Sequence, residues 1–152
     1  MKRSFYLRSA LEVAPDLIGM KLCTKVGKKI TSGMIVEVEA YCGDIDPAAH
    51  TFNGPTKRNQ VMFEMGGKCY VYFTYGMHYC VNVVTGPQKV GDAVLIRALE
   101  PVEGVEIINR RRGKVRGLNL TNGPAKLTQA LGIDLRHLGE DLIESKKIWL
   151  EP

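Results

Sequence analysis

The 152-residue sequence lacks any apolar stretch long enough to span a membrane, and it contains no Cys-x-x-Cys pair. Its four cysteines are widely spaced, and its three histidines show no zinc-finger spacing, so we expect no metal site. No apolar signal-peptide stretch follows the basic start of the chain. These absences predict reduced, mostly buried thiols in a cytoplasmic protein, or a nuclear one if the source cell has a nucleus.

Internal repeats, low-complexity segments and linkers are also missing, and the length is typical of one domain, so residues 1–152 are expected to fold as a single compact unit. The net charge of +5 comes from 21 basic and 16 acidic residues and is compatible with a polyanionic partner without being diagnostic of one. A dense basic run follows an apolar helix-like stretch and fits either a solvated helix end or a phosphate contact: Arg110, Arg111, Arg112, Lys114 and Arg116.

The hydrophobic pattern predicts strands joined by short turns, with a few helices beside them. The strands are expected over 21–26, 30–41, 68–74, 79–84, 93–99 and 148–150, with 93–99 in the centre because it is almost wholly apolar. The helices are expected over 15–20, 59–65, 101–112 and 124–131, and an irregular loop over 42–58. The sum is an α+β fold: a mixed, mainly antiparallel sheet with flanking helices.

The segment 36–41 is the most informative one, because it alternates apolar and polar residues as a half-buried strand does. Such a strand would turn three side chains to each side: Val36, Val38 and Ala40 to one, and Glu37, Glu39 and Tyr41 to the other. If the polar side borders a pocket, it offers acid–base chemistry beside a flat ligand. If it faces open solvent, the pattern describes an ordinary one-sided sheet.

Glu39 is the candidate general base toward a water molecule. A nearby cation would keep it ionised, and Arg97 is the obvious candidate, since a charge inside an apolar strand needs a partner. Arg97 could equally serve in a structural ion pair. Glu37 is expected to face solvent.

Aromatic residues could complete such a pocket. Tyr70 and Tyr72 share a strand face, and Tyr41 and His50 could join them to sandwich a planar base. The alternatives are that the tyrosines are packing residues and that His50 orders its loop.

Tyr75 is different, because a large aromatic beside Gly76 in a tight turn is pushed outward. It could act as a wedge that enters a base stack, or make a local turn contact with Met77. Arg58 could reach a phosphate or the protein backbone.

Six ordered blocks of the sequence resemble the alkyladenine-type 3-methyladenine DNA glycosylases. The blocks are Glu37-Val38-Glu39-Ala40-Tyr41, Asp46-Pro47-Ala48-Ala49-His50, Thr56-Lys57-Arg58-Asn59, Tyr70-Val71-Tyr72-Phe73-Thr74-Tyr75-Gly76-Met77-His78, Leu95-Ile96-Arg97-Ala98-Leu99-Glu100-Pro101 and Asn122-Gly123-Pro124-Ala125-Lys126-Leu127. The resemblance implies an α+β enzyme without metal or cofactor, cytoplasmic or nucleoid-associated, and a monomer is the default expectation. Its partner would be double-stranded DNA containing damaged purine bases.

The resemblance also implies residue roles. The catalytic residues would be Glu39 and Arg97, and the wedge Tyr75. Base recognition would fall to Tyr41, His50, Tyr72 and Asn82, and DNA contact to Tyr75, Met77 and Arg58. The enzyme would flip out alkylated or deaminated purines and hydrolyse the N-glycosidic bond. No nucleophilic lysine or N-terminal proline lies in these motifs, so no strand cleavage is expected.

Two departures and two alternatives accompany this interpretation. Family members continue with further strands beyond the segment that resembles 148–150, so the chain, which ends at Pro152, is either a trimmed natural version or incomplete; the connection from Arg116 to Asn122 is also short. A non-catalytic nucleic-acid-binding domain would use the same aromatic and basic residues. A hydrolase of free nucleosides is a third possibility, although it would have no use for a wedge.

Overall fold

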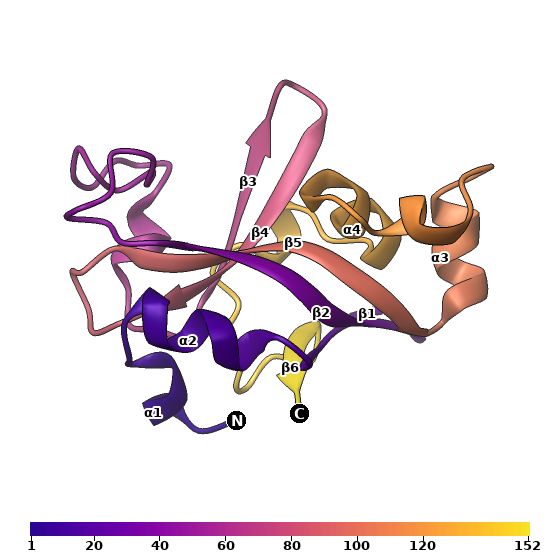
Figure 1. The fold of residues 1–152 in the computed structure, drawn as a ribbon, viewed down its shortest axis with the longest axis horizontal. Helices are drawn as coiled ribbons and strands as arrows, with labels where there is room; N and C mark the ends of the chain where they lie inside the picture. The colour runs from indigo at the N-terminus through magenta and orange to yellow at the C-terminus, as the bar shows by residue number, and fades with distance from the viewer.

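Six strands form one antiparallel sheet in the computed structural model, which describes residues 1–152 (Figure 1). The strand order is β3-β4-β5-β2-β1-β6, so the two longest strands, β2 and β5, lie in the middle. The strands are β1 (Lys21–Val26), β2 (Lys29–Tyr41), β3 (Cys69–Thr74), β4 (His78–Thr85), β5 (Asp92–Glu103) and β6 (Ile148–Glu151). The predicted α+β class and the central place of 93–99 are confirmed.

Helices connect and cover these strands. They are α1 (Arg3–Tyr6), α2 (Ala10–Leu17), α3 (Val105–Arg111) and α4 (Pro124–Leu131), with the short 3-10 helices η1 (Gln60–Phe63), η2 (Gly117–Leu120) and η3 (Leu135–His137). None of the helices combines the length and the apolar composition that a membrane crossing requires. Residues 42–58 form the predicted irregular loop between β2 and η1.

The main hydrophobic core is a cluster of 24 buried residues between the sheet and the helices α2 and α4. Leu17 of α2 and Leu127 of α4 are both fully buried in it, together with Ile96 of β5. Figure 1 shows α2 beside the central strands and α4 beside β4 and β5, which agrees with their contacts. The core therefore holds the central strands in place from one side.

The other side of the sheet carries a smaller cluster. Because successive strand residues point to opposite faces, Tyr70 and Val84 turn away from the main core. They pack instead with Ala93 and with Val61 and Met62 of η1. This side of β2, β3, β4 and β5 carries the polar and aromatic residues that the sequence singles out.

The predicted position of the first long helix, residues 15–20, is wrong. α2 begins at Ala10, directly after Ser9, whose backbone N–H donates to the Glu12 carboxylate at 3.1 Å in a capping box. Pro15 lies in the last turn rather than the first, and its missing N–H removes one helical hydrogen bond shortly before the helix ends.

A second correction concerns the helix expected from Pro101, because β5 continues past that residue. Leu99, two residues earlier, turns its backbone N–H away from β2 to the Thr121 carbonyl at 3.1 Å. The missing N–H of Pro101 therefore lies on the same outer edge, where the ladder loses nothing. Gly104, with φ of 68°, then turns the chain into α3.

The pairing of β2 with β5 slips in register between Ile35 and Val38, as in a β-bulge. The register is the same before and after the irregularity, since Ile35 pairs with Leu99 and Val38 with Ile96, but each strand holds two residues between these pairs. Ile35 and Val38 therefore both face the main core although they are three positions apart, whereas Val36 is 48% exposed. The prediction that Val36 shares a face with Val38 and Ala40 is wrong, while those two residues do pack against the core.

Candidate active site

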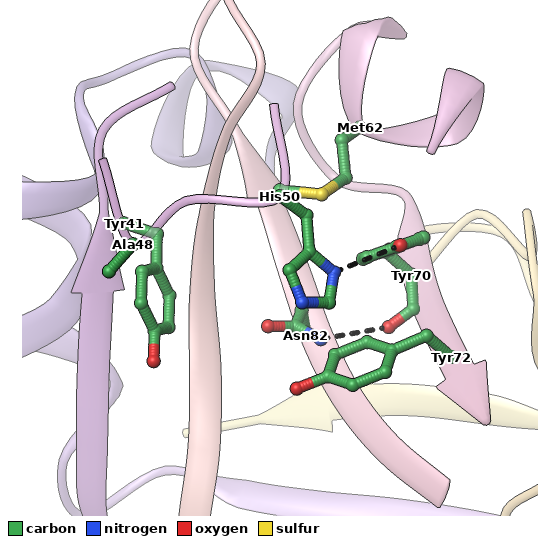
Figure 2. Close-up of a pocket in the computed structure, with 7 residues that line it drawn as sticks. All are labelled: Tyr41, Ala48, His50, Met62, Tyr70, Tyr72 and Asn82. Atoms are coloured by element: carbon green, nitrogen blue, oxygen red, sulfur yellow. Dashed lines mark hydrogen bonds between the residues drawn. The ribbon is translucent and has the colours of Figure 1, made fainter. Parts of the chain in front are cut away.

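A pocket opens on the side of the sheet away from the main core (Figure 2). Its walls come from β2, the loop 42–58, η1, β3 and β4: Tyr41, Ala48, His50, Met62, Tyr70, Tyr72 and Asn82. The structure thus brings together all four residues expected to recognise the base, which come from positions 41 to 82 of the sequence.

Aromatic rings form two sides of this pocket. His50 lies edge-on to Tyr72 with ring centroids 4.4 Å apart, and Tyr70 lies 5.8 Å from Tyr72. The His50 Nδ1 atom is 3.4 Å from the Tyr70 hydroxyl. Figure 2 shows Tyr41 on the opposite side of the space from these three rings. A planar group placed between them would meet aromatic surface on both sides.

Asn82 closes the pocket from β4 and is 4% exposed. Its side-chain amide donates to the Tyr70 carbonyl at 3.3 Å, which fixes the plane of the amide. Its amide oxygen accepts no hydrogen bond within the protein, so it is available as an acceptor at the pocket wall.

His50 is held in place by a residue for which sequence reasoning proposed no role. Asn59 is buried, and its side chain donates to the carbonyls of His50 at 2.8 Å and Gly54 at 3.2 Å. Its amide oxygen also accepts from the Thr56 backbone N–H at 2.6 Å. A loop asparagine that bonds nearby backbone groups is common, and that preference is the only signal in the sequence. Met62 also lines the pocket, and nothing in the sequence predicted that position.

Burial changes the proton affinity of the pocket residues. It lowers the pKa of His50, and the charge of Arg58 acts in the same direction. It raises the pKa of the Tyr41 phenol to about 12, and the Glu39 carboxylate adds to that increase. It also raises the pKa of Tyr72. At neutral pH, the pocket therefore presents a neutral imidazole and neutral phenols.

Beside Tyr41, three charged side chains form one cluster across β2 and β5. The Arg97 guanidinium donates from Nε to Glu37 at 3.0 Å and from Nη1 to Glu39 at 2.8 Å. The predicted contact between Arg97 and Glu39 is confirmed. Glu37, which was expected only to face solvent, is a second partner, although its side chain is 57% exposed.

The β3–β4 hairpin stands out from the body of the protein in Figure 1, and its tip is the segment 75–77. Tyr75 is 91% exposed and Met77 69% exposed, as expected for an outward-pointing turn. A hydrogen bond of 3.3 Å from the Met77 N–H to the Thr74 carbonyl closes the turn. Tyr75 adopts φ of 51°, a left-handed conformation that is uncommon for a bulky residue.

One of the two contacts considered for Arg58, that with the protein backbone, is present, since its guanidinium donates to the Phe73 carbonyl at 2.6 Å. That bond ties the loop 42–58 to β3 near the hairpin. The side chain is exposed, so its remaining donors are free to meet a ligand.

Three of the five basic residues at the end of α3 and just after it bond to protein carbonyls. Arg111 donates to Ala130 O, Arg112 to Leu120 O and Arg116 to Gly113 O. These contacts give three residues of the run a structural role, and a phosphate contact of the run stays a prediction. Elsewhere, no three His, Cys, Asp or Glu side chains gather closely enough to hold a metal ion.

The carboxylate of Glu39 and the aromatic pocket together can support acid–base chemistry on a bound planar group. A carboxylate held by a guanidinium lies two residues from Tyr41 on the polar side of β2, next to a slot between aromatic rings. Such a carboxylate can accept a proton from water while the slot holds a planar group beside it.

Comparison with known proteins places the chain in a larger group. A family profile described as methylpurine-DNA glycosylase (MPG) matches residues 4–152. A protein of Carboxydothermus hydrogenoformans named "Putative 3-methyladenine DNA glycosylase" is 51% identical over 150 residues, which is 99% of this chain and 78% of that protein. A protein of Burkholderia orbicola with the same name is 50% identical over 146 residues, 95% of this chain and 69% of that protein.

Proposed function

The chain belongs to the methylpurine-DNA glycosylase family, and on this premise we propose that it flips alkylated or deaminated purines out of duplex DNA and excises them. It is a DNA glycosylase, a hydrolase of N-glycosyl bonds that acts in DNA repair. The observation that supports the finer proposal is the slot between Tyr41 and the His50–Tyr72 pair, together with Glu39, which lies against the Tyr41 phenol on β2. Excision would leave an abasic site and so initiate base excision repair.

The first step is extrusion of the damaged nucleotide, whose sugar C1′ atom is shielded inside a duplex. Extrusion costs a few kcal/mol, and less for a damaged or mispaired base. Tyr75 is the only large side chain at the projecting hairpin tip besides Met77, and both are highly exposed. Tyr75 enters the vacated gap in the base stack and offsets part of that cost.

The second step is recognition of the purine between the aromatic rings. An alkylated purine is cationic, and the faces of Tyr41 and Tyr72 attract a cation through the ring quadrupole. A neutral His50 does not repel that charge, which agrees with its lowered pKa. The pocket therefore prefers a cationic base to a normal one. The same positive charge makes the purine a good leaving group, so that a strong general acid is unnecessary.

Hydrolysis follows at the sugar. Glu39 accepts a proton from a water molecule, and the water oxygen forms a bond to C1′. The N-glycosidic bond breaks, and its electron pair leaves with the purine. Arg97 donates to Glu39 at 2.8 Å and orients the carboxylate for this step. No amine takes part, so the enzyme is monofunctional and leaves the DNA strand intact.

The test is an excision assay on duplex DNA that carries a single methylated purine, with the released base measured by chromatography. The wild-type chain should release the base without cutting the strand. Glu39→Gln should bind the same duplex with unchanged affinity and lose excision by at least about 100-fold, the scale for removing a general base.

Other outcomes would favour the alternatives. Binding without release by the wild-type chain would support a non-catalytic nucleic-acid-binding domain. Release from free methylated nucleosides at the same rate as from duplex would support a nucleoside hydrolase. Near-normal excision by Glu39→Gln would remove Glu39 from the role of base.

A further inference from the structure

The mechanism above leaves Glu37 unused, although it bonds directly to Arg97. We infer that Glu37 is a positioning residue for excision: it fixes the Arg97 guanidinium so that Nη1 points at Glu39. This inference rests on the proposed role of Glu39 as the base.

The first support is the geometry of the guanidinium. Its five N–H donors lie in one rigid plane, so fixing one donor limits the directions of the others. Glu37 accepts from Nε at 3.0 Å, the nitrogen where the plane joins the flexible part of the side chain. With Nε fixed, the rotation that would swing Nη1 away from the Glu39 oxygen, 2.8 Å distant, is restricted.

The backbone supplies the second support. The register between β2 and β5 shifts on both sides of Glu37, which pairs with Ala98, while Val38 pairs with Ile96. Arg97 thus falls at the irregularity, and the two glutamates flank it. Bulges are over-represented next to active sites, where they redirect a side chain. Here the bulge brings two carboxylates to one guanidinium.

The third support is that stability does not explain the contact. The side chains of Arg97 and Glu37 are 38% and 57% exposed, and such surface ion pairs contribute little to folding. The cluster holds two carboxylates and one guanidinium, so its net charge is −1 and Arg97 does not neutralise Glu39 alone. Glu37 therefore orients the Arg97 guanidinium, and Glu39 remains available to accept a proton.

The experiment measures single-turnover excision from duplex containing a methylated purine, DNA affinity and melting temperature for three variants. Glu37→Ala removes the acceptor and should slow excision roughly 10- to 100-fold, the scale of a misplaced catalytic group, with affinity and melting temperature unchanged. Glu37→Gln keeps an acceptor oxygen and should recover most of the rate. Glu151→Ala is the control: it removes a partly exposed carboxylate on β6 that pairs with Lys21 of β1 at 2.8 Å. This variant should excise at the wild-type rate.

A double substitution tests whether Glu37 acts through Arg97. In an Arg97→Lys background, which keeps the charge but removes the planar fork, Glu37→Ala should cause no further loss. Equal losses in both backgrounds, or a wild-type rate for Glu37→Ala, would overturn the inference. Either result alongside an inactive Glu39→Gln would leave the role of Glu39 intact. An active Glu39→Gln would instead remove Glu39 from the role of base, on which this inference rests.

Discussion

His50 of the loop 42–58 and Tyr72 of β3 lie with ring centroids 4.4 Å apart at an interplanar angle of 61°. The loop is thereby fixed against the sheet by the same two rings that form one wall of the pocket. The imidazole edge meets the tyrosine ring, an arrangement that aromatic quadrupoles favour. Any change to either ring therefore alters both the order of the loop and the shape of the slot.

Tyr72 should contribute to lesion affinity through its ring rather than its hydroxyl. Tyr72→Ala is expected to weaken binding of a lesion-bearing duplex by about 1–3 kcal/mol, the usual size of one base–aromatic stack. Tyr72→Phe keeps the ring and should bind as the wild type does. Fluorescence anisotropy measures the affinities, with all proteins carrying Glu39→Gln to prevent turnover. Equal losses for both variants would contradict the stacking role.

His50 predicts a pH dependence that differs between lesions. Burial lowers its pKa below the usual 6.5, so the folded protein takes up fewer protons than the unfolded chain. The stability linked to this residue is therefore complete above pH 6.5 and falls as the pH drops below it. Once protonated, His50 would also repel a cationic methylpurine. Excision of such a lesion should consequently fall more steeply between pH 7 and about pH 5 than excision of neutral hypoxanthine.

The control for this prediction is His50→Gln, which keeps a polar group and cannot gain a charge in this range. It should bring the two pH profiles closer together, because it removes the positive charge that repels only the cationic lesion. Parallel profiles in the wild-type protein would show that His50 does not set the charge preference.

Local patterns were sufficient for most of the fold. The alternation in 37–41 and the tight turn around Gly76 are set by neighbouring residues, and both predicted strand pairs formed where they were expected. The start of α2 at Ala10 and the path of β5 through Pro101 were missed. Pro101 stays in its strand only because a distant residue, Thr121, covers the outer edge of β5.

In the candidate site, too, some features could be predicted from the sequence and others depend on contacts between distant residues. The resemblance pointed to Tyr41, His50, Tyr72 and Asn82, and the structure brings them to one pocket. The bond from Asn59 to His50 could not be predicted, since it depends on how the loop closes on itself. Neither could the contact of Arg97 with its second partner, Glu37, because it depends on the irregular pairing of β2 with β5, which periodicity does not encode.

Tyr75 should show a conflict between stability and binding. Its φ of 51° costs a non-glycine residue of this size roughly 1–2 kcal/mol, whereas asparagine tolerates that conformation better. Tyr75→Asn is therefore expected to raise the free energy of unfolding by about 1 kcal/mol and to weaken binding to lesion-bearing duplex. Chemical denaturation and anisotropy measure the two effects.

Met77→Asn is the matched control on the same hairpin, because Met77 is similarly exposed but does not have a positive φ. It should weaken DNA binding without raising stability. If Tyr75→Asn bound and excised as the wild type does, the wedge would have no support.

Salt dependence tests whether Arg58 reaches a phosphate in addition to Phe73. Each phosphate contact releases counterions, so the logarithm of the binding constant falls linearly with the logarithm of salt concentration. One guanidinium donor of Arg58 bonds to the Phe73 carbonyl at 2.6 Å, and the exposed remainder can meet DNA next to the hairpin. Arg58→Gln should therefore reduce the slope by about 1.

Arg116→Gln provides the comparison for this measurement, since Arg116 donates to the carbonyls of Gly113 and Val115 within its own loop, both at 2.7 Å. Its substitution should leave the slope unchanged while removing the same unit of charge. An unchanged slope for Arg58→Gln, with a lowered melting temperature, would assign Arg58 to the backbone contact alone. Equal reductions for both variants would indicate a general effect of net charge rather than a contact at the hairpin, because long-range attraction depends on total charge and not on position.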